Sequence, residues 1–189
     1  STFYILPPDA HLDFVAKGES LLETYWVVPG RLLVGDSPRY LQEAERRAVL
    51  QRLFGQGVDT IIDLSGEEDY EEGNFEGLVQ DEVAALGKHA AYWALTLPNR
   101  KAPKRDRIKT VLDTIDQALA GGYTVFVGCG SQYKQSGMVA GCYLARHGLP
   151  GKQSLREVER LRAHTTYWWL PSPALESQRR LVRGWQVGE

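Results

Sequence analysis

The chain has 189 residues, of which 43% are hydrophobic and 24% charged, and its formal net charge is −2. These values fit one globular domain, and the slight negative charge argues against a nucleic-acid binder, which is normally basic. Two cysteines are too few for a disulfide framework, and the sequence has neither an apolar run long enough to cross a membrane nor a signal-peptide pattern. We therefore expect a cytoplasmic protein that has no membrane segment.

The first half of the chain predicts two strands, a helix and a third strand. Residues 1–24 show only weak periodicity and are expected to form an N-terminal arm, so that one domain spans 25–189. Strands are predicted at 25–28 and 31–34 around a tight Pro29-Gly30 turn. A helix follows over 41–54, then a β-branched core strand over 58–64. An acidic loop is expected at 65–76 and a short helix at 77–86.

The second half alternates strands and helices. Strands are predicted over 90–97 and 123–127, separated by a loop at 98–103 and by an amphipathic helix over 106–119 that stops at Gly121-Gly122. Three more helices are expected, one beginning near Ser136 and two over 155–163 and 173–185. This alternation predicts an α/β fold with a central, mostly parallel sheet flanked by helices.

The most informative stretch runs from Val125 to Gly137 and has the sequence VFVGCGSQYKQSG. It is typical of a buried strand, a polar loop that opens with Cys129, and a helix N-terminus. Backbone N–H groups and the helix dipole would converge there into an anion cradle, which favours the thiolate of a cysteine at its mouth. The pattern suggests a thiol nucleophile facing a bound phosphate. Cys142, inside the following helix, is predicted to be a core residue.

This stretch resembles the signature of the protein tyrosine and dual-specificity phosphatase superfamily, which is His-Cys, five residues, Arg, Ser or Thr, and Gly. The segments 26–35 and 61–64 are similar to the opening strands of that group, and 171–173 with 178–180 to its C-terminal segment. The resemblance covers about residues 25–185 and implies the cysteine-phosphatase fold.

The resemblance also assigns roles to residues of the loop. Cys129 stands at the nucleophile, Ser136 at the residue that helps the thiolate leave, and Asn99 near the position of the general-acid aspartate. Gln135 replaces the arginine, and Gly128 replaces the histidine. The implied ligand-binding residues are Gly130, Ser131, Gln132, Tyr133, Lys134, Gln135 and Gly137. No metal or organic cofactor is implied.

These departures predict a large loss of hydrolytic activity. Arginine offers a planar, permanently charged fork, and losing such a clamp costs on the order of 10²–10³ in rate. Asparagine cannot supply a proton, and general acid catalysis contributes roughly 10²–10⁴-fold. Lys134 either replaces part of the arginine's charge or points to solvent.

Several other groups have more than one interpretation. Asp63 ends a strand and serves either a turn or the site. The acidic run at 67–72 is a solvated loop, the carrier of a substitute acid, or a face that docks a partner. The basic residues from Arg100 to Lys109 either form a solvated helix start or steer an anion inward. Trp168 and Trp169 are expected to pack the C-terminal helices.

Two functional hypotheses remain open from the sequence. The first is an atypical or pseudo-phosphatase that binds a phosphorylated protein or a small anionic ligand with weak or no hydrolysis. The second is an active cysteine-dependent enzyme that uses Cys129 as its nucleophile in phosphoester hydrolysis or another thiol reaction. No nucleic-acid or membrane partner is expected, and the oligomeric state is left open.

Overall fold

A five-stranded sheet forms the centre of the protein in this computed structural model, which describes residues 22–65, 74–98, 100–130, 134–165 and 168–189. The strand order is β1-β2-β5-β3-β4. Only β1 is antiparallel to its neighbour; β2, β5, β3 and β4 run parallel. The strand bounds are Thr24–Val28 (β1), Leu32–Asp36 (β2), Thr60–Asp63 (β3), Ala91–Ala94 (β4) and Val125–Cys129 (β5).

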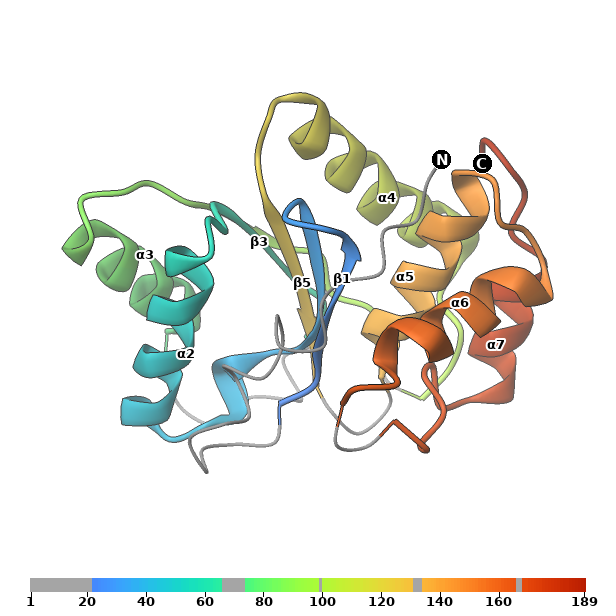
Figure 1. Cartoon of the computed structure of the whole chain (residues 1–189), viewed down its shortest axis with the longest axis horizontal. Coiled ribbons are helices and arrows are strands. Elements are labelled where there is room, and N and C mark those ends of the chain that lie inside the picture. Colours follow the sequence, from blue (N-terminus) through green and yellow to red (C-terminus); the bar gives the residue numbers. More distant parts are fainter. Residues whose placement is uncertain (1–21, 66–73, 99, 131–133, 166–167) are drawn as a thin grey trace.

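Helices cover both faces of the sheet (Figure 1), in the α/β arrangement that the sequence predicts. On one side lie α2 and α3, which span Glu43–Gly55 and Phe75–Ala85. On the other side lie α4 (Arg105–Ala120), α5 (Gln135–Arg146), α6 (Lys152–Arg162) and α7 (Glu176–Arg183). A 3₁₀ turn, η2 (Pro38–Tyr40), follows β2.

Two apolar cores fill the space between the layers, because side chains alternate between the faces of each strand. Ile62 and Val127 join the larger core with α4, α5 and the C-terminal helices. Ile61 and Phe126 join the smaller core with α2 and α3. The helix α5 runs through the larger core and is buried from Gln135 to Ala145, so the segment that follows the cysteine loop is fixed on all sides.

The predicted elements agree with the structure apart from their ends. The first hairpin closes where Gly30 adopts a φ of 70° and Arg31 N–H donates to the Val28 carbonyl at 2.9 Å. The predicted arm, apart from its last three residues, lies outside the described part of the chain, as does most of the acidic loop. Trp168 and Trp169 do not pack the C-terminal helices, because they are 58% and 63% exposed. Trp185, which is fully buried, fills that core instead.

Candidate active site

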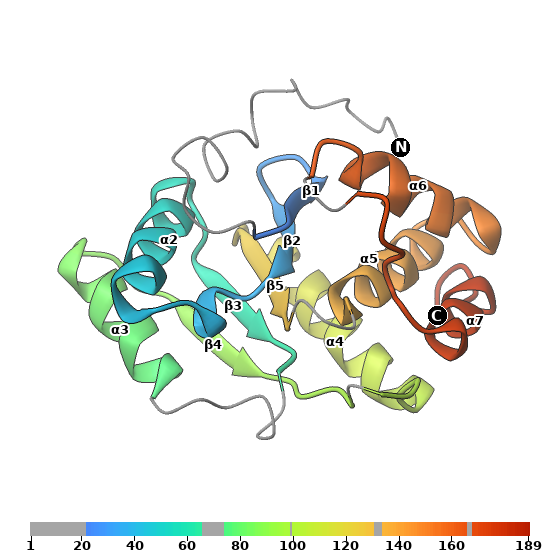
Figure 2. The ribbon, with the colours of Figure 1, turned by 90° about the horizontal axis from the view of Figure 1, so that it is seen from below.

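The carboxyl ends of three parallel strands bring the candidate residues to one edge of the sheet (Figure 2). Cys129 ends β5 and pairs in register with Asp36, the last residue of β2. Gly128 pairs with Asp63, the last residue of β3. Ser37 N–H donates to the Cys129 carbonyl at 2.7 Å and ties the loop after β2 to the cysteine. Ligand sites of open α/β sheets form at such carboxyl ends.

The thiol of Cys129 is fully buried. It donates to the Gly130 carbonyl at 3.2 Å, and its Sγ accepts the Ser136 N–H at 3.2 Å. The pKa of the Cys129 thiol is raised to about 12, mainly by burial and also by the nearby charge of Asp36, although hydrogen bonds from Ser136 and the charge of Lys134 lower it. The thiol is therefore protonated in this arrangement, contrary to the favoured thiolate that the sequence suggests.

Ser136 lies where its main chain and side chain can both act on the sulfur. Its N–H is bonded to Sγ, and its fully buried hydroxyl has no partner of hydrogen-bond geometry in the described part of the chain. A buried polar group without a partner is costly and is a common mark of a functional position. The Ser136 side chain nonetheless lowers the pKa of Cys129.

Gly137 stands at the glycine of the family signature, and the structure shows why a glycine is needed at this position. A Cβ at this residue would lie 1.9 Å from the Ser172 hydroxyl. That hydroxyl donates to the Lys134 carbonyl at 3.2 Å, so the segment around residue 172 is packed directly against the start of α5. Glycine is therefore required for this close approach.

Gln135, which stands where the resemblance expects arginine, is 1% exposed. Its Nε2 donates to the carbonyl of Pro98 at 3.4 Å. This contact joins the cysteine loop to the segment just before Asn99. Asn99 itself, together with Ser131, Gln132 and Tyr133, lies outside the described residues, so the roles assigned to these four stay predictions.

Lys134 does not point to solvent, so that one of its two interpretations is wrong, and its role as a partial substitute for the arginine's charge stays a prediction. Its backbone is left-handed, with a φ of 54°, and the residue is only 4% exposed. Its Nζ lies 3.2 Å from each carboxylate oxygen of Asp36 and 3.9 Å from an oxygen of Glu23. The ammonium is therefore out of solvent and paired with buried carboxylates, while its charge still lowers the pKa of the Cys129 thiol.

The pair belongs to a larger set of buried charges, which we call the charge network: Glu23, Asp36, Lys134 and Arg162. Arg162 Nη2 lies 2.7 Å from Glu23 Oε1, and the Glu23 N–H donates to Asp36 Oδ2 at 3.0 Å. Burial raises the pKa of the Asp36 carboxyl, and the charge of Lys134 partly offsets this. Two positive and two negative charges leave the network neutral overall when all four groups are ionised.

Two other candidates have structural partners. Asp63 accepts the Ser65 N–H at 3.0 Å, which is the turn role, and it also pairs with Arg39 at 2.8 Å. In the basic stretch, Arg105 pairs with Glu189 and its guanidinium lies 4.7 Å from the ring centre of Trp185. Cys142 is buried in the larger core as predicted, and burial raises the pKa of its thiol above the ordinary range.

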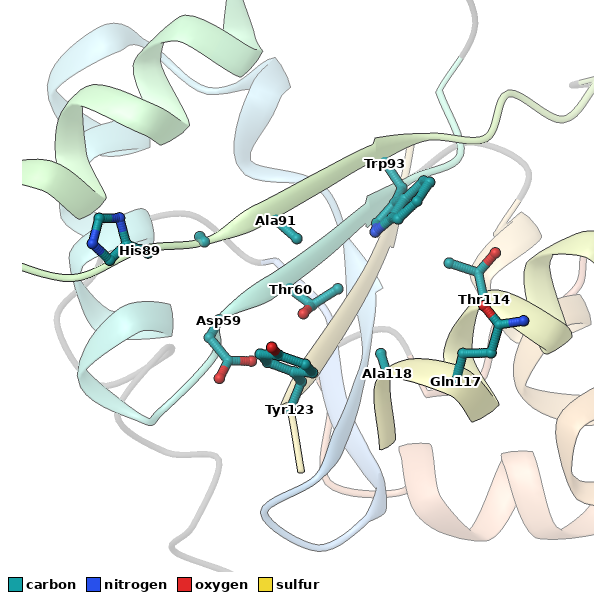
Figure 3. Close-up of a pocket in the computed structure, with 10 residues that line it drawn as sticks. Asp59, Thr60, His89, Ala91, Trp93, Thr114, Gln117, Ala118 and Tyr123 are labelled. Atoms are coloured by element: carbon teal, nitrogen blue, oxygen red, sulfur yellow. The ribbon is translucent and has the colours of Figure 1, made fainter. Parts of the chain in front are cut away.

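A cavity of about 490 Å³ lies between β4 and α4 (Figure 3). It lies at the amino ends of β3 and β4 and includes Asp59, Thr60, Trp93 and Tyr123 in its lining. Because Cys129 lies at the carboxyl ends of the strands, this cavity is separate from the cysteine loop. Within the described ranges, no helix is long and apolar enough to cross a bilayer, and no cluster of three His, Cys, Asp or Glu residues could hold a metal.

A cysteine at the end of a central parallel strand, followed by a loop and a buried helix, defines a domain of the cysteine-phosphatase class. The family model described as PTP-SAK, Swiss Army Knife protein, DSP-PTPase phosphatase domain, matches residues 22–179. The chain therefore belongs to this family.

Solved structures share the fold at low sequence identity. The active form of Tk-PTP is 18% identical, with a TM-score of 0.62, covering 85% of this chain and 94% of its own. The human tyrosine phosphatase-like serine/threonine/tyrosine-interacting protein is 16% identical, with a TM-score of 0.61 and coverages of 85% and 93%. Kinase associated phosphatase with its catalytic cysteine changed to serine is 12% identical, with a TM-score of 0.62 and coverages of 85% and 90%. At these identities the likeness concerns the fold.

Proposed function

We propose that this phosphatase domain binds an anionic ligand at the Cys129 loop and hydrolyses it weakly or not at all. The ligand would be a phosphorylated protein or a small molecule carrying phosphate or another oxyanion. The observation that carries the proposal is the full burial of Cys129, which raises the pKa of its thiol and keeps it protonated. A protonated thiol is a poor nucleophile.

The replacement of the arginine supports the same proposal. An arginine would offer two parallel donors and a full charge to the transferring phosphoryl group. Gln135 has no charge, and its Nε2 is directed at the Pro98 carbonyl. The nearby cation, Lys134, is held by Asp36. Binding would depend on the loop amides and on the dipole of α5, which attract anions without requiring chemistry.

A second candidate function is a working cysteine enzyme, and one observation favours it. The N–H and hydroxyl of Ser136 both lie beside the sulfur of Cys129, an arrangement that lowers the pKa of the thiol. If a conformational change admitted water to the loop, the desolvation that raises the pKa would weaken. Cys129 would then act as a nucleophile toward an activated ester.

Turnover of p-nitrophenyl phosphate by the native chain separates the two functions. Cys129→Ser is the blank, and Cys142→Ala, which alters the other buried thiol, is the matched control. The binding function predicts a native rate that equals the blank or exceeds it only slightly. A native rate several orders of magnitude above the blank that is kept by Cys142→Ala would establish the enzyme instead.

Binding is measured separately, because absence of turnover alone does not show a ligand. Phosphate or sulfate should raise the melting temperature of the native chain in proportion to the logarithm of its concentration. Gln135→Arg should increase this shift by adding a charged donor. If no anion shifts the melting temperature of either protein, the binding function is wrong.

A further inference from the structure

The cavity between β4 and α4 (Figure 3) lies where the helices leave one face of the edge strand uncovered. β4 is the last strand of the sheet, and Ala91 and Trp93 are exposed on the face that lines the cavity. On the opposite face, Tyr92 packs against the smaller core. The small side chains of Ala91 and Ala118 leave a hollow of about 490 Å³, a volume typical of small-molecule sites.

Two aromatic rings stand at opposite ends of this cavity, with Thr60 between them (Figure 3). Trp93 is 49% exposed and Tyr123 is 52% exposed. Trp93 belongs to β4 and Tyr123 precedes β5, and β3 lies between these two strands. The Tyr123 N–H donates to the Ala118 carbonyl at 3.0 Å, and a Cβ on Gly121 would lie 2.9 Å from its ring, so this ring is held in place. Each ring therefore offers a separate apolar surface to a ligand.

Polar groups between the two rings keep capacity for hydrogen bonds to a ligand. Thr60 is only 2% exposed and lines the cavity, yet its hydroxyl makes no hydrogen bond within the described ranges. A buried hydroxyl left in this state is costly, and a ligand would relieve the cost. Asp59 Oδ1 accepts the Thr124 N–H at 2.8 Å, which fixes the carboxylate and leaves further lone pairs. Gln117 of α4 adds an amide that both donates and accepts.

The charges of the cavity narrow the class of ligand. In the part of the chain that the structure describes, no lysine or arginine lines the cavity, and Asp59 is its one carboxylate, so an anion would be repelled. An organic cation is held best where ring faces surround it, and here the rings stand at opposite ends. A wholly apolar ligand would leave the Thr60 hydroxyl unpaired. The class that remains is a neutral molecule with flat apolar faces and several hydroxyls.

A sugar ring has this character, because its C–H groups form flat apolar faces and its hydroxyls project around the rim. The partly positive C–H hydrogens favour the negative face of an aromatic ring. We propose that the cavity between β4 and α4 binds a neutral oligosaccharide of at least two sugar rings, one on Trp93 and one on Tyr123. Its hydroxyls bond to Asp59, Thr60 and Gln117. This site is separate from the cysteine loop, so it adds a second binding function and does not depend on the proposed one.

Four neutral trisaccharides test the site by saturation-transfer NMR, followed by titration of the tightest binder: maltotriose, cellotriose, laminaritriose and mannotriose. At least one of them should bind the native chain. Trp93→Ala and Tyr123→Ala should each weaken that binding about tenfold or more, because each removes one stacking surface. Tyr123→Phe keeps the ring and should bind within about threefold of the native chain.

Two controls separate this cavity from other surfaces. Trp169→Ala is the matched control, since Trp169 is 63% exposed but does not line the cavity, and it should leave the affinity unchanged. Cys129→Ser should also bind the trisaccharide as the native chain does. Phenyltrimethylammonium and adenosine are the comparison probes for an organic cation and for a nucleoside. Because the proposed ligand is neutral, its affinity should not change with salt concentration.

Three outcomes overturn the sugar site. The first is a native chain that binds no trisaccharide at about 10 mM, and the second is tighter binding of either comparison probe. The third is sugar binding that Trp93→Ala and Tyr123→Ala leave unchanged, which would place the sugar elsewhere. If an alanine variant does not fold, as judged by circular dichroism, Gln117→Ala decides, since this exposed helical position tolerates alanine and an unchanged affinity there also overturns the site.

Discussion

The chemical state of Cys129 gives the sharpest prediction. An ordinary cysteine thiol has a pKa near 8.5, so about a quarter of it is thiolate at pH 8. With a pKa of about 12, the Cys129 thiol is thiolate in only about one molecule in 10⁴ at the same pH. Alkylation requires the thiolate. We therefore expect native Cys129 to react with iodoacetamide about 2,000-fold more slowly than a free thiol from ionisation alone, and burial slows it further.

The pH dependence of this reaction carries the same information with its sign. The thiolate fraction rises about tenfold per pH unit while the pH stays below the pKa, so the rate should climb steadily from pH 7 to 10. Trypsin cleaves after Lys134 and so separates the peptide of Cys129 from that of Cys142. Mass spectrometry then follows each thiol in the same sample, with guanidinium-unfolded protein as the reactive reference.

A rate at Cys129 that levels off below pH 9 would refute the reasoning, because a plateau marks complete ionisation. Cys142 provides the internal comparison, since burial also raises the pKa of its thiol. If both cysteines react slowly and with the same slope, both thiols stay mainly protonated over this pH range. If Cys129 alone is fast, the loop opens to water, and the enzymatic function gains support.

Three further predictions concern stability and are read from denaturant unfolding. Gly137→Ala places a Cβ 1.9 Å from a serine hydroxyl and should lower the free energy of unfolding by about 1–3 kcal/mol. Gly55→Ala is the control, because its Cβ would meet nothing within 4 Å, and it should be neutral or stabilising. Equal effects of the two substitutions would contradict the close packing at Gly137. Arg162→Met leaves Glu23 buried without its guanidinium partner and should cost roughly 3–5 kcal/mol, unless the carboxylate finds water. Trp185→Ala empties a fully buried site and should cost about 3–5 kcal/mol; a loss below about 1 kcal/mol would place the indole outside the core.

Local patterns were enough to predict the fold. The β-branched run that contains Ile61 and Ile62 forms the core strand β3, and the apolar spacing that includes Ile108, Val111 and Ile115 forms the buried face of α4. These signals depend on residues a few positions apart, which the sequence displays directly. The position of Cys129 at the end of a strand follows from the same kind of pattern.

The charge network could not be predicted in this way. Lys134 and Asp36 are 98 positions apart, and Arg162 and Glu23 are 139 apart. In sequence, each of these residues looks like an ordinary solvated charge, because lysine, arginine, aspartate and glutamate are mostly exposed unless paired. Their pairing depends on tertiary packing that brings β1, β2, α6 and the cysteine loop together.

The burial of individual tryptophans could not be predicted from the sequence either. Trp168, Trp169 and Trp185 are equally suited to a core by composition, yet only Trp185 is buried. Its place is fixed by the guanidinium of Arg105 over its ring, a contact across 80 residues of chain. Hydrophobicity alone predicts that some tryptophan fills the C-terminal core, and the tertiary contacts decide which one.

Gly128 stands where the family signature has histidine, and its surroundings leave little room for a side chain. A Cβ at this position would lie 2.9 Å from the Phe126 ring and 3.3 Å from the Ser37 Cα. A histidine there would require the Phe126 ring to shift and would press tightly against Ser37. Ser37 also donates its N–H to the Cys129 carbonyl, directly after Asp36. The end of β2 therefore lies directly against Cys129, with Ser37 beside Gly128 and the neighbouring Asp36 paired with Lys134.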